Sequence, residues 1–197
     1  MAKQKEQAEL DFLNAQFNPH FLFNSINSIY GHIDKQNATA RNMLLTFSEM
    51  LRYQLYDCNS NVIDIEKEMK YIKNYVALQK ERKDETLIIN LIIDDNIKGI
   101  AVAPLLCIAF IENSFKHVSN SEEKENRIEI SLIKKNDALH FRCYNTKEIN
   151  AKNNIEHKGI GIANARRRLQ LLYPDKNDLE VIDDGDFYEV NLKLQVT

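Results

Sequence analysis

The side chain best suited to chemistry in this chain is His20, within residues 18–24, which read NPHFLFN. Pro19 stands directly before it, inside a segment that otherwise has the pattern of a long amphipathic helix. A proline in a helix interior removes a backbone hydrogen bond and costs about 3 kcal/mol. We interpret that cost as a feature that serves the neighbouring histidine, because a neutral imidazole on a helix surface is a competent nucleophile.

The helix around His20 has an apolar stripe on its other side. The stripe recurs at helical spacing and comprises Leu22, Ile26, Ile29 and Ile33. His20 lies almost opposite the stripe, and Asn24 follows it by one helical turn. We therefore predict a helix that packs with one side and presents an imidazole on the other, where Asn24 orients one ring nitrogen. A surface histidine beside an accidental kink is the alternative that residue types leave open.

A second group of reactive side chains lies in residues 105–118, LLCIAFIENSFKHV. Asn113 shares a helix face with Lys116 and His117, and Glu112 is its neighbour in sequence. An amide oxygen suits Mg²⁺, which prefers oxygen ligands and is usually shared with substrate phosphates. The two basic side chains would offset phosphate charge. An ordinary surface turn with a Glu112–Lys116 pair explains the same residues when they are considered alone.

Two glycines, Gly159 and Gly161, stand at the start of a later predicted helix. Glycines at that point let the backbone approach a phosphate, and a helix N-terminus favours an anion. A single G-x-G is weak evidence. It gains weight from its place after a strand, the Asn113 helix, a hairpin and a polar loop.

The elements that must position these groups divide into a helical half and a mixed half, with the boundary near residues 84–86. In the first half we expect helices over 3–33, 39–57 and 65–83, with a turn at 34–38 and Asp64 as N-cap of the third helix. In the second half we expect strands over 87–94, 127–135, 138–145, 179–183 and 187–196, and helices from Pro104 to 118 and from Gly159 to the residue before Pro174.

Composition excludes several classes of protein. Apolar residues make up 44% and charged residues 28% of the 197 residues, as in an ordinary globular protein, and the net charge of −3 gives no reason to expect nucleic acid as a partner. No apolar run reaches membrane-span length, and from the polar first residues we expect no signal peptide. The three cysteines lack metal-ligand spacing, and we expect Cys107 and Cys143 to be buried, reduced thiols.

Residues 13–29, LNAQFNPHFLFNSINSI, resemble the phosphoacceptor segment of LytS-type sensor histidine kinases. The resemblance continues through LRYQL at 51–55 and IEKEMKYIKNYVALQKER at 65–82. It implies that His20 is phosphorylated from ATP and that the surrounding helices form a hairpin that dimerises.

The second half is similar to the GHKL ATPase superfamily, whose fold is one layer of helices over a mixed sheet. The resemblance implies that Asn113 coordinates Mg²⁺ and that Glu112 stands where some members have a general base. Gly159 and Gly161 match the second glycine motif, residues 146–158 match the ATP lid, and Asn164 belongs to a following N-x-x-x-R-L pattern.

One position departs from that family. Members usually place an aspartate after the third strand to accept a hydrogen bond from the adenine amino group, and here Asn145 stands there. An amide oxygen still accepts a hydrogen bond but lacks the strength of a charged carboxylate. We expect weaker ATP binding or relaxed adenine selectivity.

Together these resemblances imply an α+β protein, with a dimerisation and phosphoacceptor hairpin at 1–62, a linker helix at 63–85 and an ATP-binding domain at 86–197. The implied reaction is transfer of phosphate from MgATP to His20 and then to an aspartate of a response regulator. The nucleotide site would include Lys116, His117, Asn145 and Asn164, and Asn24 would position a water for the reverse, phosphatase reaction. We expect a homodimer that forms the cytoplasmic portion of a sensor, attached to a membrane only through an upstream segment.

Two alternatives remain open from the sequence. The first is a dimeric interaction module that senses nucleotide with little or no turnover. The second is a phosphotransfer protein that receives phosphate on His20 from another kinase, which the Asn113 and glycine motifs argue against.

Overall fold

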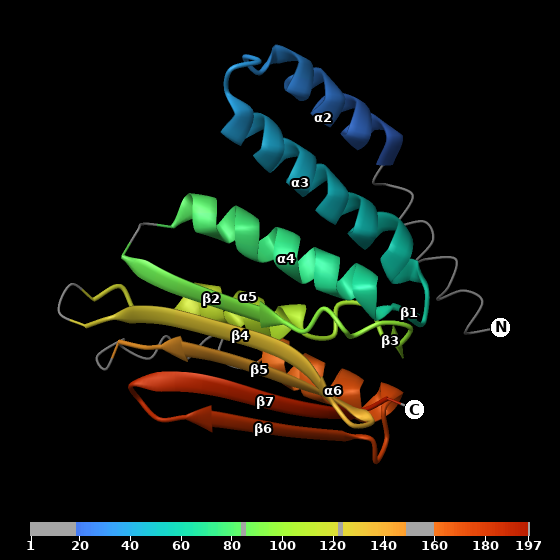
Figure 1. Cartoon of the computed structure of the whole chain (residues 1–197), viewed down its shortest axis with the longest axis vertical. Coiled ribbons are helices and arrows are strands. Elements are labelled where there is room, and N and C mark those ends of the chain that lie inside the picture. The colour runs from blue at the N-terminus through green and yellow to red at the C-terminus, as the bar shows by residue number, and fades with distance from the viewer. Residues whose placement is uncertain (1–18, 84–85, 122–123, 149–159, 197) are drawn as a thin grey trace. The chain divides into compact units, whose positions relative to one another are not determined.

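The computed structural model describes residues 19–83, 86–121, 124–148 and 160–196 (Figure 1). The chain divides into two compact units, residues 1–55 and 56–197. The segment expected as a linker helix, 63–85, falls within the second unit, and the expected segments 1–62, 63–85 and 86–197 stay a prediction. Each unit is described below by itself.

The first unit contains a helical hairpin of α2 (Pro19–His32) and α3 (Ala38–Tyr56). Asn37 caps α3, since its Oδ1 accepts the backbone N–H of Ala40 at 3.0 Å. Arg41, in the first turn of α3, donates to the carbonyl oxygens of Tyr30 and Ile33 at 3.4 and 3.2 Å. The same guanidinium lies 3.9 Å from the centroid of the Tyr30 ring. Arg41 therefore fixes the end of one helix against the start of the next.

The apolar stripe of α2 is buried only in part. Ile26 is 5% exposed, whereas Ile29 is 52% exposed. The described part of α2 begins at Pro19, so the predicted proline kink and the helix over 3–18 fall on residues outside the described ones. His20 is exposed, as expected from its place opposite the stripe.

The second unit is built on a five-stranded sheet with the order β2-β4-β5-β7-β6. The pairing of β2 with β4 is parallel and the other pairings are antiparallel, so the sheet is mixed. The sheet strands are β2 (Leu87–Ile93), β4 (Asn126–Lys135), β5 (Ala138–Thr146), β6 (Asn177–Asp183) and β7 (Phe187–Gln195). A small antiparallel pair joins β1 (Ile63–Asp64) to β3 (Ala101–Val102).

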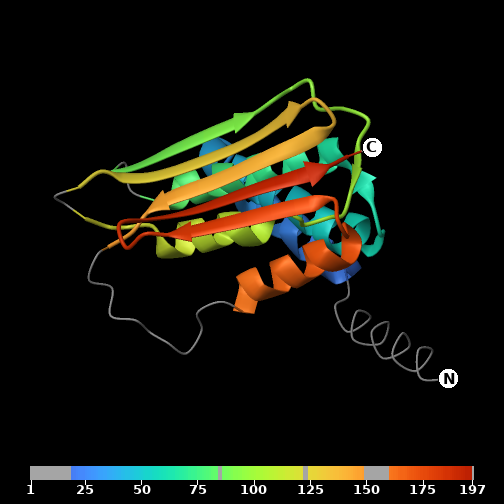
Figure 2. The ribbon, with the colours of Figure 1, turned by 90° about the horizontal axis from the view of Figure 1, so that it is seen from below.

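Three helices lie on one face of the sheet, as Figure 2 shows: α4 (Ile65–Arg82), α5 (Ile108–His117) and α6 (Ile160–Leu172). A short 3-10 helix, η1 (Asp57–Asn59), precedes them. Alternation along the strands explains the layering, because in β4 and β5 buried residues such as Ile130, Phe141 and Cys143 alternate with more exposed ones. The fold is therefore α+β with helices over a mixed sheet, which confirms the expected fold class.

The opposite face of the sheet carries charge. Arg142 on β5 bridges Glu129 on β4 and Glu189 on β7, at 2.8 and 2.7 Å. Hydrogen bonds from Arg142 lower the pKa of both carboxyl groups, and those from Arg127 and Asn191 add to the effect. Opposite charges on neighbouring strands stabilise this central strand register.

One local prediction was wrong, and a second was right only in position. The helix expected from Pro104 begins at Ile108, because residues 104–107 form a turn in which Leu105 has a φ of 54°. Asp64 occupies the N-cap position of α4 but makes no capping hydrogen bond in the described helix. Its backbone is extended and pairs with Ala101, and the next N–H, of Ile65, donates to the carbonyl of Ile100 at 2.8 Å.

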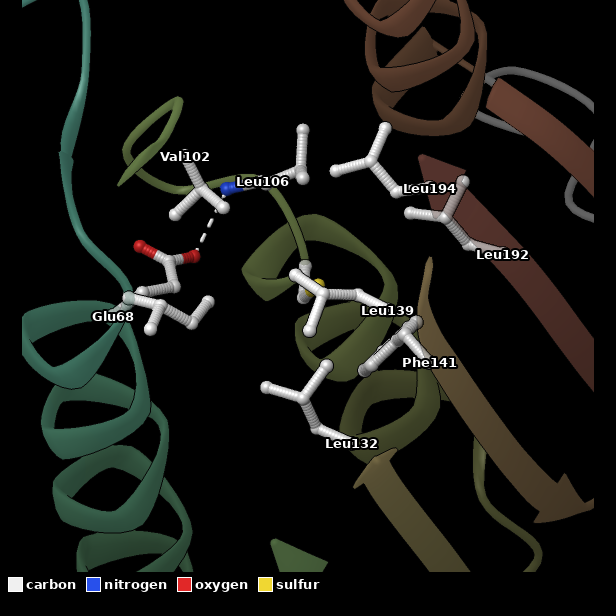
Figure 3. Close-up of a pocket in the computed structure, with 10 residues that line it drawn as sticks. Glu68, Val102, Leu106, Leu132, Leu139, Phe141, Leu192 and Leu194 are labelled. Atoms are coloured by element: carbon white, nitrogen blue, oxygen red, sulfur yellow. Dashed lines mark hydrogen bonds between the residues drawn. The ribbon is translucent and has the colours of Figure 1, made fainter. Parts of the chain in front are cut away.

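The turn before α5 is held by a buried carboxylate on α4 (Figure 3). Glu68 is 1% exposed and accepts the N–H groups of Leu105 and Leu106, each at 2.9 Å. From α6, Arg168 donates to the carbonyl of Leu105 at 3.3 Å, and the Tyr173 hydroxyl accepts the N–H of Ala103 at 2.7 Å. Charge-assisted bonds of this kind offset the cost of burying the carboxylate and of the left-handed Leu105. The start of α5 is thus fixed from both neighbouring helices.

We predict that Glu68→Gln lowers the free energy of unfolding by about 2–4 kcal/mol. The amide turns one acceptor oxygen into a donor that faces the Leu105 or Leu106 N–H, and it removes the charge. Urea unfolding followed by circular dichroism measures the change. Glu81→Gln, at an exposed position of the same helix, is the matched control and should change stability by less than about 0.5 kcal/mol. Equal effects of the two substitutions would contradict the role assigned to Glu68.

Candidate functional site

His20 lies on the exposed surface of α2, with Asn24 one turn further on. The Asn24 Nδ2 atom is 3.3 Å from Nδ1 and 3.4 Å from Nε2 of the imidazole. The lone-pair directions of the two ring nitrogens diverge in the ring plane, so a donor equally close to both aligns with neither. Asn24 therefore contacts the ring without fixing a tautomer, and its orienting role stays a prediction.

His32 on the same helix offers a contrast. Its Nδ1 lies 2.7 Å from the carbonyl oxygen of Ser28, so that nitrogen carries a proton and donates it to the backbone. His20 has no backbone hydrogen bond among those that the structure describes. Of the two α2 histidines, His20 is the one whose ring is not held by the backbone.

In the second unit, α5 is amphipathic: one side is apolar, and the other side carries predicted site residues. Phe110, Ile111 and Phe115 are buried, which points the other side of the helix outward. The residues on that side are Glu112, Lys116 and His117, which are exposed, and Asn113, which is half-buried. Partial burial raises the pKa of the Glu112 carboxyl. A raised pKa makes the Glu112 carboxylate a stronger base than an ordinary carboxylate.

On its inner side, helix α5 contacts β5 through a buried polar pair. The Ser114 hydroxyl lies 3.1 Å from the Cys143 thiol, and both side chains are buried. Burial raises the pKa of the Cys143 thiol to about 12 and the pKa of the Cys107 thiol well above its usual value, so both stay protonated. This confirms the expectation of buried thiols at these two positions.

Asn145 lies two residues beyond Cys143 on the same, helix-covered face of β5. It is fully buried, and its Nδ2 donates to the carbonyl oxygen of Thr146 at 3.0 Å. Its Oδ1 is buried and finds no donor among the residues that the structure describes. Such an atom is uncommon in folded proteins and calls for an explanation.

The glycine motif is described only in part. Gly159 and most of the predicted lid fall on residues 149–159, outside the described ones, while Gly161 lies in the first turn of α6. A Cβ built on Gly161 would meet nothing within 4 Å. Packing against the described residues therefore does not require glycine at this position. Close approach of a ligand to the backbone is another reason for a glycine here.

Asn164 is the next predicted site residue on α6. It lines an open cavity of about 390 Å³ whose walls are α6 and the segment that joins η1 to β1. The other lining residues are Cys58, Asn59, Ser60, Asn61, Arg167, Arg168, Leu171 and Leu172. The structure thus brings Glu112, Asn113, Lys116 and His117 together on one helix face, with Gly161 on the helix that packs against it. Asn164 follows Gly161 by about one turn of α6, and its place at a nucleotide site stays a prediction.

Sequence reasoning missed the buried support of this site. Glu68 was not among the predicted site residues, and its contact with Leu105 spans 37 residues. An acidic residue among apolar positions of an amphipathic helix was the available indication.

The described residues show no helix with the length and apolar character needed to cross a membrane. They also contain no cluster of three or more His, Cys, Asp or Glu side chains that would hold a metal by itself. A cation at Asn113 would therefore need ligand oxygens from elsewhere, such as phosphates.

Comparison with known proteins agrees with this arrangement. A family model described as histidine kinase matches residues 8–87. The sensor histidine kinase/phosphatase LytS of Staphylococcus aureus strain MRSA252 is 33% identical over 194 residues, which cover 98% of this chain and 31% of LytS. The chain thus spans about a third of the length of this relative.

Solved structures share the fold. The histidine kinase domain of a blue-light activated histidine kinase from Erythrobacter litoralis aligns with a TM-score of 0.53 at 13% identity, covering 98% of this chain and 94% of that one. Full-length ShkA in complex with AMPPNP aligns with a TM-score of 0.51 at 13% identity, covering 96% of this chain and 46% of ShkA. The sequence match over almost the whole chain and the shared fold lead to one conclusion: this chain belongs to the histidine kinase family.

Proposed function

We propose that this chain is the catalytic portion of a two-component sensor histidine kinase, which transfers phosphate from ATP to His20. One observation carries the proposal: a single chain combines an exposed imidazole on a helical hairpin with a mixed-sheet unit of the histidine kinase fold. The hairpin supplies the acceptor and the sheet unit supplies the phosphoryl donor. Positioning and charge neutralisation account for most of the catalysis in such a transfer.

The nucleotide site that we propose lies along α5 and the start of α6. Bound Mg²⁺ would neutralise charge on the phosphates, and the Asn113 amide oxygen is the side chain that fits it, because Mg²⁺ shares oxygen ligands with phosphates. Lys116 and His117, one turn on, face the same side and would meet the phosphate tail. Gly161 and Gly159 would let the backbone approach that tail at the N-terminus of α6.

Two routes remain for the imidazole proton. Phe21 follows His20 and is 70% exposed, so no acidic neighbour stands next to the histidine in sequence. Glu112, with its raised pKa, is the base we propose. A neutral imidazole also attacks through its free lone pair without a base.

The proposed partners follow from the family. The hairpin would pair with that of a second copy in a homodimer, and an aspartate of a response regulator would receive the phosphate from His20. LytS is named a kinase and phosphatase, and we propose that Asn24 positions a water for the phosphatase reaction. The chain would form the cytoplasmic portion of a sensor that an upstream segment anchors in a membrane.

An alternative is a dimeric module that senses nucleotide without turning it over. The observation that favours it is Asn145, which replaces the acidic residue usual at this position in the GHKL superfamily. The two functions differ in whether phosphate reaches His20.

Incubation with γ-labelled ATP and Mg²⁺ tests the proposal. We expect label on the wild type, none on His20→Gln, and at least a hundredfold less on Asn113→Ala, an order of magnitude set by loss of a metal ligand. His32→Gln is the matched control and should keep the label, since that ring is bonded to the backbone. Nucleotide binding without label would support the sensing module, and label only after addition of a second kinase would support a relay protein.

Glu112→Gln tests the proton route. If Glu112 is the base, the rate of autophosphorylation should fall by about 10²-fold with little change in ATP affinity. Because the pKa of Glu112 is raised, the wild-type rate should also begin to fall on acidification at a higher pH than an ordinary carboxyl group would give. A wild-type rate in the variant would leave the imidazole lone pair as the only route.

Asn24→Ala tests the phosphatase role. We expect slower dephosphorylation of the phosphorylated response regulator by at least about tenfold, while label still accumulates on His20 from ATP. Asn27→Ala removes another exposed amide from α2 and serves as the control. An unchanged phosphatase rate in Asn24→Ala would contradict the role.

A further inference from the structure

The open cavity beside α6 is separate from the residues proposed to hold nucleotide. Its walls are one side of α6 and residues 58–61, the segment that joins η1 to β1, and its volume is about 390 Å³. None of the α5 side chains proposed for the nucleotide site lines it, and neither does Gly161. The whole cavity belongs to the second unit. Its volume is in the range of small-molecule sites, roughly 300–1,000 Å³.

The charged side chains on the cavity wall are all positive. Arg167 and Arg168 line the cavity, and no aspartate or glutamate does. Asp57, which directly precedes the segment 58–61, is paired with Lys67, whose Nζ lies 2.5 Å from its Oδ1. In the part of the chain that the structure describes, neither guanidinium forms an ion pair with a carboxylate. The cavity therefore attracts anions.

The wall also keeps hydrogen-bond donors for a ligand. Arg168 is half-buried and donates from Nη1 to the carbonyl oxygen of Leu105 at 3.3 Å. A guanidinium has five N–H donors in a planar fork, so this bond fixes the side chain and leaves other donors over. The side-chain amides of Asn61 and Asn164 line the same cavity and add neutral donors.

This set of donors suits a phosphate group better than a carboxylate. The two oxygens of a carboxylate match the fork of a single arginine. A phosphate monoester carries close to two negative charges and three terminal oxygens, which can accept from two guanidiniums and an amide together. The remaining wall is apolar, because Leu171 and Leu172 line the cavity with 63% and 46% exposure. An organic group attached to the phosphate would cover these two leucines.

We propose that this cavity binds a small phosphate monoester with an apolar organic part. Arg167 and Arg168 hold the phosphate, and Leu171 and Leu172 contact the organic part. Arg168 also donates to Leu105 in the turn before α5, so a bound phosphate orients the guanidinium that holds this turn. The site is thus separate from the proposed nucleotide site and is linked through Arg168 to the start of α5.

Phenyl phosphate is the probe that tests the proposal, by ¹H–¹⁵N NMR titration of the whole chain. We expect chemical-shift changes concentrated in residues 58–61 and 164–172. Orthophosphate lacks the ring and benzoate replaces the phosphate with a carboxylate, so both should bind at least about tenfold more weakly. Equal affinity for benzoate, or shift changes confined to other parts of the chain, would overturn the inference.

Two neighbouring arginines provide a matched pair of variants. Arg167→Gln should weaken binding of phenyl phosphate at least about tenfold, through loss of charge-assisted hydrogen bonds. Its thermal midpoint should stay near that of the wild type, because Arg167 is exposed. Arg166→Gln removes the same charge from a position that does not line the cavity and is the control. Equal weakening by both substitutions would indicate general attraction between charges and would overturn the site.

Cys58 gives a second readout inside the cavity. Its thiol lines the cavity and is half-buried, whereas Cys107 and Cys143 are buried. Phenyl phosphate should slow the reaction of Cys58 with a neutral disulfide reagent in proportion to the fraction bound, and should do so far less in Arg167→Gln. An unchanged rate at saturating phenyl phosphate would contradict the proposal.

A competition experiment separates this site from the nucleotide site. Saturation with ADP and Mg²⁺ should not displace phenyl phosphate from the cavity. Displacement would make the cavity part of the nucleotide site and would overturn the inference. Binding of phenyl phosphate by a chain that binds no ADP would support this inference while contradicting the proposed function.

Discussion

The hydrogen bonds that the Glu68 carboxylate accepts from the Leu105 and Leu106 amides are the constraint on which the sheet unit of this protein depends. They place a carboxylate with 1% exposure at the point where the chain must turn through a left-handed leucine before α5 begins. Because Arg168 holds the other side of the same peptide, α4 and α6 both meet at this turn. The helix that carries Asn113 therefore takes its starting point from its two neighbours.

This support makes the polar face of α5 possible. The inner side of the helix is committed to the core, through Phe110 and Ile111 and through the Ser114 contact with Cys143. Its outer side is then free to present Glu112 and Asn113, and partial burial raises the pKa of the Glu112 carboxyl. Helix α2 of the helical unit is amphipathic in the same way, since Ile26 is buried while His20 is exposed. In both units an amphipathic helix packs with its apolar side and exposes polar, reactive side chains on the other side.

Asn145 departs from the family pattern, and its contacts in the fold change the interpretation of that departure. By residue type it is a neutral replacement for a carboxylate, which suggests weaker binding or relaxed selectivity. In the fold its nitrogen donates to the Thr146 carbonyl, and its oxygen has no donor among the residues that the structure describes. Residue type gives the chemical groups that are available, and the neighbouring backbone decides which of them is already hydrogen-bonded within the fold.

By itself, the sequence determined the elements whose cause is local. Alternation placed β4 and β5, and helical periodicity placed α3 and α4 within about two residues. The motif around His20 was enough to predict the family. Only the tertiary structure decided where α5 begins, whether Asp64 caps α4, where Asn164 faces and which way the Asn145 amide points. Each of these depends on a partner that the local pattern does not contain, such as Glu68 for Leu105 or Ala101 for Asp64. Periodicity indicates whether a segment prefers a helix or a strand. Long-range hydrogen bonds form only when the fold brings distant residues together.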